Sequence, residues 1–407
     1  MLYAFLASWE RIWPDLQIFR YITFRASLAA ISAFLICVIL GPRIIRLLSS
    51  RGVHEDVGRS DSPALNRLHA GKKHTPTMGG LIFLLAMFGG VFLWGRLDNP
   101  YVLLVLGVST ALGAVGFVDD FIKLTSKDKP GLRARTKLAW QVLVGTAAGL
   151  VLFSVLEVRL PDPPAADRGA PVTSRDQGPP VLPVASSDLA GEPRYSIRDD
   201  SDLGTSVFFP VFRRVRVPLG ILFIGLVALV VVASSNAVNL TDGLDGLACG
   251  SLILVSGTFA IVAYVVGRTD FAGYLRLPYV PGAGELSVLC SAMVGAGMGF
   301  LWHNCHPASV FLGDTGALPL GGAIGLVAVI LKQEFLLLIA GGIFVVEAAS
   351  VILQVASFRL RGKRVFRIAP LHHHFQFLGW PESKITVRFW IVGAILALIS
   401  LVTLKVR

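Results

Sequence analysis

Long apolar stretches recur throughout the chain and leave few architectures open to it. A bilayer hydrocarbon core is ~30 Å thick, and a helix needs about 20 apolar residues to cross it. Only 15% of the residues are charged, whereas soluble proteins have about 25%. The pattern predicts an all-α, polytopic integral membrane protein with about ten transmembrane helices. The predicted spans lie at about 22–41, 77–95, 102–118, 138–156, 218–235, 247–267, 287–302, 317–331, 336–357 and 387–404.

The sequence predicts one membrane domain, residues 1–407, with one long insertion at 157–217. The insertion holds 9 of the 22 prolines and nearly balanced charges, 8 basic and 9 acidic. We predict a flexible loop without a core of its own. Four scattered cysteines form neither a zinc-ribbon nor a disulfide pattern. The spaced glycines Gly321 and Gly325, and the run Gly295–Gly299, are interpreted as helix-packing positions rather than as a nucleotide-binding loop.

The charge distribution predicts how the chain lies in the membrane. Ten spans put both termini on one side and the loops 42–76, 119–137, 236–246, 303–316 and 358–386 on the other. These five loops carry 19 Lys and Arg residues, against 8 in the short segments of the opposite face. The positive-inside rule places the five loops in the cytoplasm, and both termini and the insertion outside. The excess of basic residues in these loops also accounts for the net charge of +11, so no nucleic acid partner is expected.

Unusual polar clusters occur in all five loops predicted to be cytoplasmic. Ionisable residues at membrane depth are functional candidates, and a purely structural membrane protein would not need five such clusters on one face. We therefore expect an active site at the cytoplasmic surface. The clusters are Lys72–Thr77, Val118–Phe121, Asn236–Gly246, Phe311–Gly316 and Pro370–Phe375.

The carboxylate pair Asp119-Asp120 has two interpretations. The pair could simply mark the end of a helix at the membrane interface. Carboxylates at a helix C-terminus are unfavourable for the helix dipole, however, so a divalent metal or nearby lysines would have to offset them. Since adjacent residues do not share a helix face, we expect the two to have different roles rather than to bind one ion together.

A second acidic segment contains Asn236, Asn239, Asp242 and Asp245, interrupted by glycines such as Gly243. It is either a broken helix capped by its own side chains or a nucleotide or metal site built from oxygen ligands.

Asp314, directly before an apolar span, is either a helix N-cap or a ligand. All these candidate ligands are hard oxygens, which favours Mg²⁺ or Mn²⁺ over zinc.

The three consecutive histidines, His372, His373 and His374, follow Pro370. We predict an extended segment in which alternate residues point to opposite sides. The three then cannot bind one metal, and hydrogen bonding to a phosphate fits better than acid–base catalysis. A structural role is predicted for His303 and His306, which have no clear partner in the sequence.

Basic residues surround these clusters, among them Lys72, Lys73, Lys123 and Lys137. Some serve as topology signals, and the others would suit a pyrophosphate-bearing substrate and anionic lipid headgroups. The residues together predict metal-assisted phosphoryl transfer at the cytoplasmic interface, between a lipid and a soluble substrate.

The motifs resemble those of a known family over all ten predicted spans. The chain is similar to the phospho-N-acetylmuramoyl-pentapeptide transferases, a branch of the polyprenyl-phosphate sugar-1-phosphate transferases. The resemblance lies in Thr75–Gly80, Gly116–Asp120, Asn236–Ala248, Phe311–Gly316 and Pro370–Phe375.

This resemblance implies an enzyme of the bacterial inner membrane that requires Mg²⁺. It would transfer phospho-MurNAc-pentapeptide from UDP-MurNAc-pentapeptide to undecaprenyl phosphate. The products would be lipid I and UMP, in the first membrane step of peptidoglycan synthesis. Membrane lipids would surround the enzyme, and a homodimer is the family expectation.

The resemblance also implies roles for individual residues. Asp314 matches the magnesium ligand, Asp119 the base on the lipid phosphate, and Asp120 its essential neighbour. Phe311 matches the aromatic residue that stacks on uracil, and Lys72 an active-site lysine, although His74 replaces the usual glycine and Lys73 is the alternative lysine. The segment near the nucleotide is matched by Asn236, Asn239, Asp242, Gly243 and Asp245, the histidine motif by His372, His373 and His374, and further substrate contacts are expected from Thr75, Lys123 and Lys137.

Two other classes of function compete with this one. A related enzyme that transfers N-acetylglucosamine 1-phosphate shares the aspartates, but the segment Pro370–Phe375 favours the muramoyl transferase. A lipid transporter or flippase would place polar groups at the bilayer midplane and often contains repeats, and the sequence shows neither.

Overall fold

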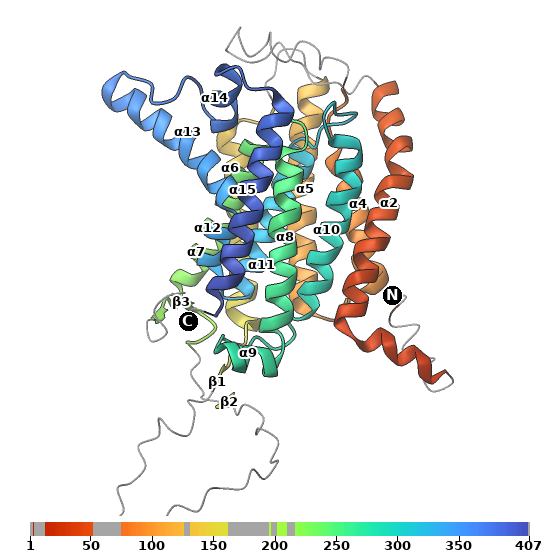
Figure 1. Ribbon diagram of the computed structural model, residues 1–407. Helices are drawn as coiled ribbons and strands as arrows, with labels where there is room; N and C mark the ends of the chain where they lie inside the picture. The colour runs from red at the N-terminus through yellow and green to blue at the C-terminus, as the bar shows by residue number, and fades with distance from the viewer. Residues whose placement is uncertain are drawn as a thin grey trace, which may run out of the picture.

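The fold is a bundle of long helices that run roughly parallel to one axis (Figure 1). The computed structural model describes residues 13–51, 75–125, 131–161, 202–209 and 216–405, with Tyr3, Tyr195 and Ser196. The elements are η1 Pro14–Arg20, α2 Ile22–Ser50, α4 Gly80–Trp94, α5 Pro100–Thr125, α6 Ala134–Val155, β1 Leu160–Pro161, β2 Tyr195–Ser196, β3 Ser206–Phe208, β4 Arg216–Pro218, α7 Leu222–Thr241, α8 Leu247–Val266, α9 Thr269–Leu275, α10 Glu285–Asn304, α11 Asp314–Ile330, α12 Glu334–Ala340, α13 Gly342–Arg361, α14 Leu371–Phe377 and α15 Glu382–Thr403.

Among the described residues, eight helices are long and apolar enough to cross a membrane: α2, α5, α6, α7, α8, α10, α13 and α15. Two further predicted spans correspond to shorter apolar helices, α4 with 15 residues and α11 with 17. The predicted span 336–357 is divided at Gly341, which separates α12 from α13. The all-α class is thus confirmed, and the number of ten spans stays a prediction.

Helix α11 forms the centre of the bundle. All 17 of its residues are buried, and it packs against α5 and α7. Gly321 lies directly against the backbone of Ser234 in α7, where a Cβ would overlap the Ser234 carbonyl oxygen, and Gly325 packs on the same residue. Gly295 of α10 likewise meets the backbone of Ala30 in α2. The predicted use of these glycines for helix packing is confirmed.

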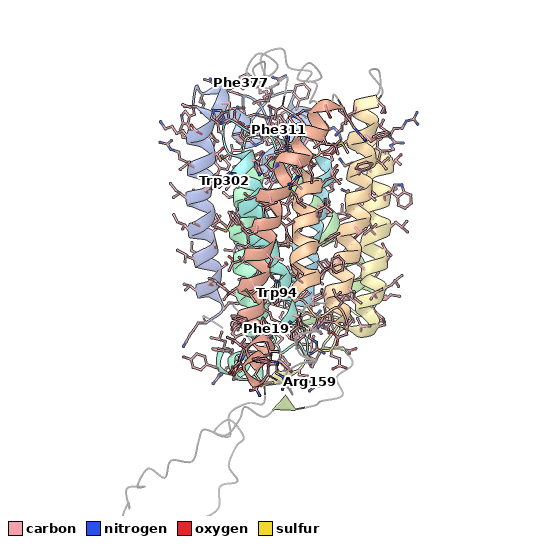
Figure 2. The ribbon with its side chains drawn as sticks, turned by 90° about the vertical axis from the view of Figure 1, so that its right-hand side faces the viewer. Phe19, Trp94, Arg159, Trp302, Phe311 and Phe377 are labelled. Atoms are coloured by element: carbon pink, nitrogen blue, oxygen red, sulfur yellow. The ribbon has the colours of Figure 1, made fainter. Side chains whose placement is uncertain are left out.

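The two ends of the bundle differ in structure. At the upper end in Figure 1 lie α14 and the outer part of α13, and at the lower end lie α9, the four short strands and the C-terminus. Figure 2 shows Phe311 and Phe377 at the upper end, and Phe19, Trp94 and Arg159 at the lower end. We use "upper end" and "lower end" in this sense.

The insertion 157–217 is only partly described, and its described parts lie at the lower end. There β1 pairs with β2 and β3 pairs with β4, in both cases antiparallel. Leu203, which is 3% exposed, belongs to the main hydrophobic core, and the carbonyl of Gly204 accepts a hydrogen bond from buried Lys332. Residues 203–208 of the insertion are thus packed against the bundle, and the prediction of a flexible loop without a core of its own stays a prediction for the rest.

Candidate active site

Two segments far apart in the sequence lie together at the upper end. The amide of Phe311 donates to the carbonyl of Pro76 over 2.8 Å, and the amide of Gly79 donates to the Phe311 carbonyl over 2.8 Å. The Thr75 hydroxyl reaches the Ala308 carbonyl at 3.5 Å. The predicted clusters around Thr75 and Phe311 thus share one site. Lys72 and Lys73 lie outside the described residues.

Three carboxylates and two lysines form a compact cluster beside these segments. The Lys123 ammonium lies 2.6 Å from Asp119 Oδ2 and 2.8 Å from Asp314 Oδ2. The Lys137 ammonium lies 2.7 Å from the same Asp314 oxygen. All three carboxylates are buried, with Asp119 2%, Asp120 3% and Asp314 8% exposed. The predicted compensation of the aspartate pair by nearby lysines is confirmed.

The two adjacent aspartates make different contacts. Asp119 Oδ1 accepts the amide of Leu132 over 2.7 Å. Asp120 Oδ2 accepts both the amide and the hydroxyl of Thr315, over 3.0 and 2.7 Å. Asp119 is therefore hydrogen-bonded to the segment before α6, and Asp120 is hydrogen-bonded to the first turn of α11.

Close backbone packing brings these helices together. A Cβ on Gly116 of α5 would overlap the backbone carbonyl of Asp314, and a Cβ on Gly80 of α4 would overlap the amide of Gly316. Gly313 precedes α11 with φ 69°, a conformation that glycine adopts without steric cost. The N-cap is Gly313 and not Asp314. The interpretation of Asp314 as an N-cap is wrong, because its carboxylate faces the lysines.

The three carboxylates of the cluster could hold a metal ion. One oxygen from each of Asp119, Asp120 and Asp314 lies within 4.8 Å of the others. The sequence predicted separate roles for Asp119 and Asp120, and their oxygens are nevertheless close enough to reach one ion. Hard oxygens at this separation suit Mg²⁺. Three carboxylates against two ammonium groups also leave a formal charge of −1 that a divalent cation would reverse.

The segment from Asp242 to Gly246 is a turn between α7 and α8 that is bonded to the loop before α11. Asp242 Oδ2 accepts the amide of Gly313 over 3.2 Å. Asp245 Oδ2 accepts the amide of Ala308 over 3.1 Å and lies 3.0 Å from His306 Nδ1. Gly246, the N-cap of α8, makes no side-chain capping hydrogen bond. Both carboxylates instead accept amides of the segment before α11.

The two asparagines of this motif lie on α7, one turn before the carboxylates. Asn236 donates to the side chain of Gln141 in α6 over 2.8 Å, and Asn239 is partly exposed. Helix α7 continues to Thr241, so the asparagines share a helix face whereas Asp242 and Asp245 do not.

The histidine segment is helical, so the predicted extended conformation is wrong. Pro370 is the N-cap of α14, and the three histidines occupy its first turn. His372 is fully buried against Glu347 of α13. His373 Nδ1 lies 2.7 Å from the side-chain oxygen of Gln376, and His374 Nδ1 accepts the amide of Arg367 over 3.2 Å. Each histidine thus has different surroundings.

Sequence reasoning overlooked several side chains of this site. His306, for which the sequence offered no partner, pairs with Asp245. Glu382 accepts the amide of Asp245 over 2.7 Å, and Glu347 contacts His372. A single carboxylate inside the apolar span 336–357 was a usable signal for Glu347. His303 packs against Gly41 of α2, consistent with its structural role.

Comparisons with known proteins identify relatives of this chain. Residues 102–332 match the family model described as "Glycosyl transferase family 4". The chain is 44% identical over 407 residues, with both chains fully covered, to the phospho-N-acetylmuramoyl-pentapeptide-transferase of Geobacter sp. (strain M21). It is equally 44% identical, again over the full length of both chains, to the protein of that name from Citrifermentans bemidjiense. The chain therefore belongs to glycosyl transferase family 4 and, within it, to the phospho-N-acetylmuramoyl-pentapeptide transferases.

Proposed function

We propose that the protein transfers phospho-MurNAc-pentapeptide from UDP-MurNAc-pentapeptide to undecaprenyl phosphate and releases UMP. The lipid product is lipid I. The observation that carries the proposal is the buried cluster of Asp119, Asp120 and Asp314 with Lys123 and Lys137, in a chain that is 44% identical over its whole length to proteins named for this transfer.

The reaction exchanges one phosphoanhydride for another. An oxygen of the lipid phosphate attacks the phosphorus next to the sugar, and the bond from that phosphorus to the UMP oxygen breaks. Both reactants are anions, so positive charge must lower their repulsion. Lys123 and Lys137 supply it, since their ammonium groups converge on one oxygen of Asp314.

Asp119 is suited to act on the lipid phosphate. Its Oδ2 lies near Lys123, and its Oδ1 accepts the Leu132 amide. These contacts hold the carboxylate in one orientation, in which it can accept the proton of a monoprotonated phosphate. Asp120, held by Thr315, fixes the start of α11 beside it.

Mg²⁺ is the cofactor that the donor set fits, with Asp314 as its ligand and Asp120 as a further carboxylate nearby. When bound, it would neutralise charge on the pyrophosphate and polarise the phosphoryl oxygens.

The nucleotide is assigned to the neighbouring surface. The backbone of Phe311 is bonded to the Thr75–Gly80 segment, and Gly313, two residues further on, is bonded to Asp242. An aromatic ring at this position can stack on uracil. We assign further nucleotide and phosphate contacts to Asn236, Asn239, Asp245 and the three histidines. Lys72, which lies outside the described residues, is proposed as an active-site lysine from its sequence motif alone. The upper end is then cytoplasmic and the lower end external, in a multi-pass protein of the bacterial inner membrane that forms homodimers.

The test is a reaction of purified protein with Mg²⁺, undecaprenyl phosphate and either UDP-MurNAc-pentapeptide or UDP-N-acetylglucosamine. We expect UMP and a muramoyl lipid from the first sugar nucleotide and no lipid product from the second. A product formed only from UDP-N-acetylglucosamine would support the related transferase instead. Chelation of divalent metal should stop the reaction, and added Mg²⁺ should restore it.

A further inference from the structure

A buried carboxylate–imidazole pair joins α13 to α14. Glu347 and His372 are both 0% exposed. Glu347 Oε1 accepts the backbone amide of His372 over 3.1 Å, and Oε2 lies 3.1 Å from His372 Nδ1. One carboxylate thus contacts both the backbone and the ring of the same residue, which fixes the ring orientation.

This contact also selects the position of the ring proton. With Glu347 ionised, its carboxylate only accepts hydrogen bonds, and the proton of this contact is then on His372 Nδ1. A carboxylate partner on one ring nitrogen determines what the opposite nitrogen offers. His372 Nε2 is therefore held on the opposite edge of the ring, away from Glu347.

That opposite edge faces the turn between α7 and α8. His372 Nε2 is buried and has no hydrogen-bond partner among the described residues. A Cβ on Gly243 would overlap this nitrogen. Gly243 is thus at van der Waals distance from the imidazole, and the position of the ring limits where the turn can lie.

The turn between α7 and α8 also contacts the residue that precedes α11. Asp242, next to Gly243, accepts the amide of Gly313 over 3.2 Å, and Gly313 directly precedes Asp314. A continuous set of contacts therefore runs from Glu347 through His372, Gly243 and Asp242 to Gly313, the residue before Asp314.

We propose that Glu347 is a positioning residue for the transfer reaction, which acts through His372 to place Asp242 and the start of α11. The inference depends on the proposed function, because its main effect is expected on turnover.

The first test compares two isosteric substitutions at buried glutamates. Glu347→Gln keeps the size of the side chain but removes the charge that orients His372, and we expect kcat to fall about 10-fold to 100-fold with a smaller change in KM. Glu285→Gln is the matched control, since Glu285 is buried in an ion pair with Arg25 in α2. The control should keep the wild-type kcat. Glu347→Asp, which retains a carboxylate, should recover part of the activity.

The second test asks whether Glu347 acts through His372. In a double-mutant cycle with His372→Asn, the two losses in kcat should be strongly non-additive. Additive losses, or a wild-type kcat for folded Glu347→Gln protein, would show that the inference is wrong while leaving the transferase function intact.

A third measurement does not depend on turnover. In ¹⁵N-histidine spectra, the signal of His372 is identified as the one that disappears in His372→Asn. In the wild type this signal should show a protonated Nδ1, and it should shift in Glu347→Gln. An unchanged His372 signal would overturn the inference. Failure of the wild type to release UMP from UDP-MurNAc-pentapeptide would instead contradict the proposed function, and the spectra would still decide the role of Glu347.

Discussion

Gly116 of α5 lies against the backbone carbonyl of Asp314 so closely that no side chain fits between them. The contact sets the distance between the helix that carries Asp119 and Asp120 and the helix that begins with Asp314. The geometry of the carboxylate cluster thus depends on a residue that has no functional group.

Gly116→Ala should therefore inactivate the enzyme. The new methyl group must push α11 away from α5, and overpacking of this kind costs about 1–3 kcal/mol of stability. We expect UMP release to fall at least about 10-fold, because misplacement of a reacting group by ~1 Å can cost about 100-fold. Gly107→Ala on the same helix is the control, since nothing lies within 4 Å of its Cβ position. Equal activity of the two variants would refute this account.

Asp314→Asn should abolish transfer. The substitution removes the charge that holds both Lys123 and Lys137 and one candidate metal ligand. We expect a loss of kcat of about 100-fold or more, since electrostatic groups at reacting centres contribute about this much. Asp98→Asn, an exposed change at the lower end, should leave kcat unaffected. Near-wild-type turnover of Asp314→Asn at saturating Mg²⁺ would exclude the proposed role.

Phe311→Ala should weaken nucleotide binding more than it slows the transfer step. Loss of a stacked aromatic residue costs about 1–3 kcal/mol per base, which corresponds to about a 5-fold to 150-fold rise in Kd. Isothermal titration with UMP measures this change. Trp302→Ala, at an exposed tryptophan of α10, serves as the comparison. Unchanged UMP affinity after Phe311→Ala would remove Phe311 from the nucleotide site.

Stability should increase with pH in alkaline solution because of Lys332. Burial lowers the pKa of Lys332 from 10.5 to about 8, partly opposed by the charge of Glu334. Between these two values the unfolded chain binds more protons than the folded one, so the free energy of unfolding rises as pH rises. The Tm in detergent should increase from about pH 8 to about pH 10, and Lys332→Met should flatten this increase. The same slope in both proteins would contradict the assignment.

The proposed orientation can be tested with single cysteines. In a Cys305→Ser background, Asp98→Cys at the lower end and Lys363→Cys after α13 both place a thiol at an exposed position. A membrane-impermeant maleimide added to intact cells should label Asp98→Cys and not Lys363→Cys. The reverse pattern would show that the carboxylate cluster faces outward.

The sequence predicted the class of fold better than it predicted the contacts between particular side chains. Apolar length located each of the eight long apolar helices among the described residues, because hydrocarbon thickness imposes that length. It did not predict the break at Gly341, which divides a continuous apolar stretch. The residues around Asp314 were recognised from their chemistry, but the pairing of Lys123 and Lys137 with one carboxylate oxygen joins three separate helices and follows only from packing.

The histidine segment shows the same limit. The sequence predicted an extended chain after Pro370, but the carboxylate of Glu347 accepts the amide of His372, the second residue of α14, and supports a helical turn. A partner 25 residues away thus decided the local conformation. The loop at 157–217 is a second case, since Leu203 is buried in the bundle although its neighbours in sequence are polar.

Every residue of α11 is enclosed by other helices, so this helix cannot slide or tilt without displacing α5 and α7. Asp314 at its first position is consequently attached to the least movable element of the molecule. Two large substrates, one from the lipid and one from water, must nevertheless enter and leave on every turnover. Whatever rearrangement admits them, α11 stays in place, so the substrates have to be brought to Asp314 rather than Asp314 to the substrates.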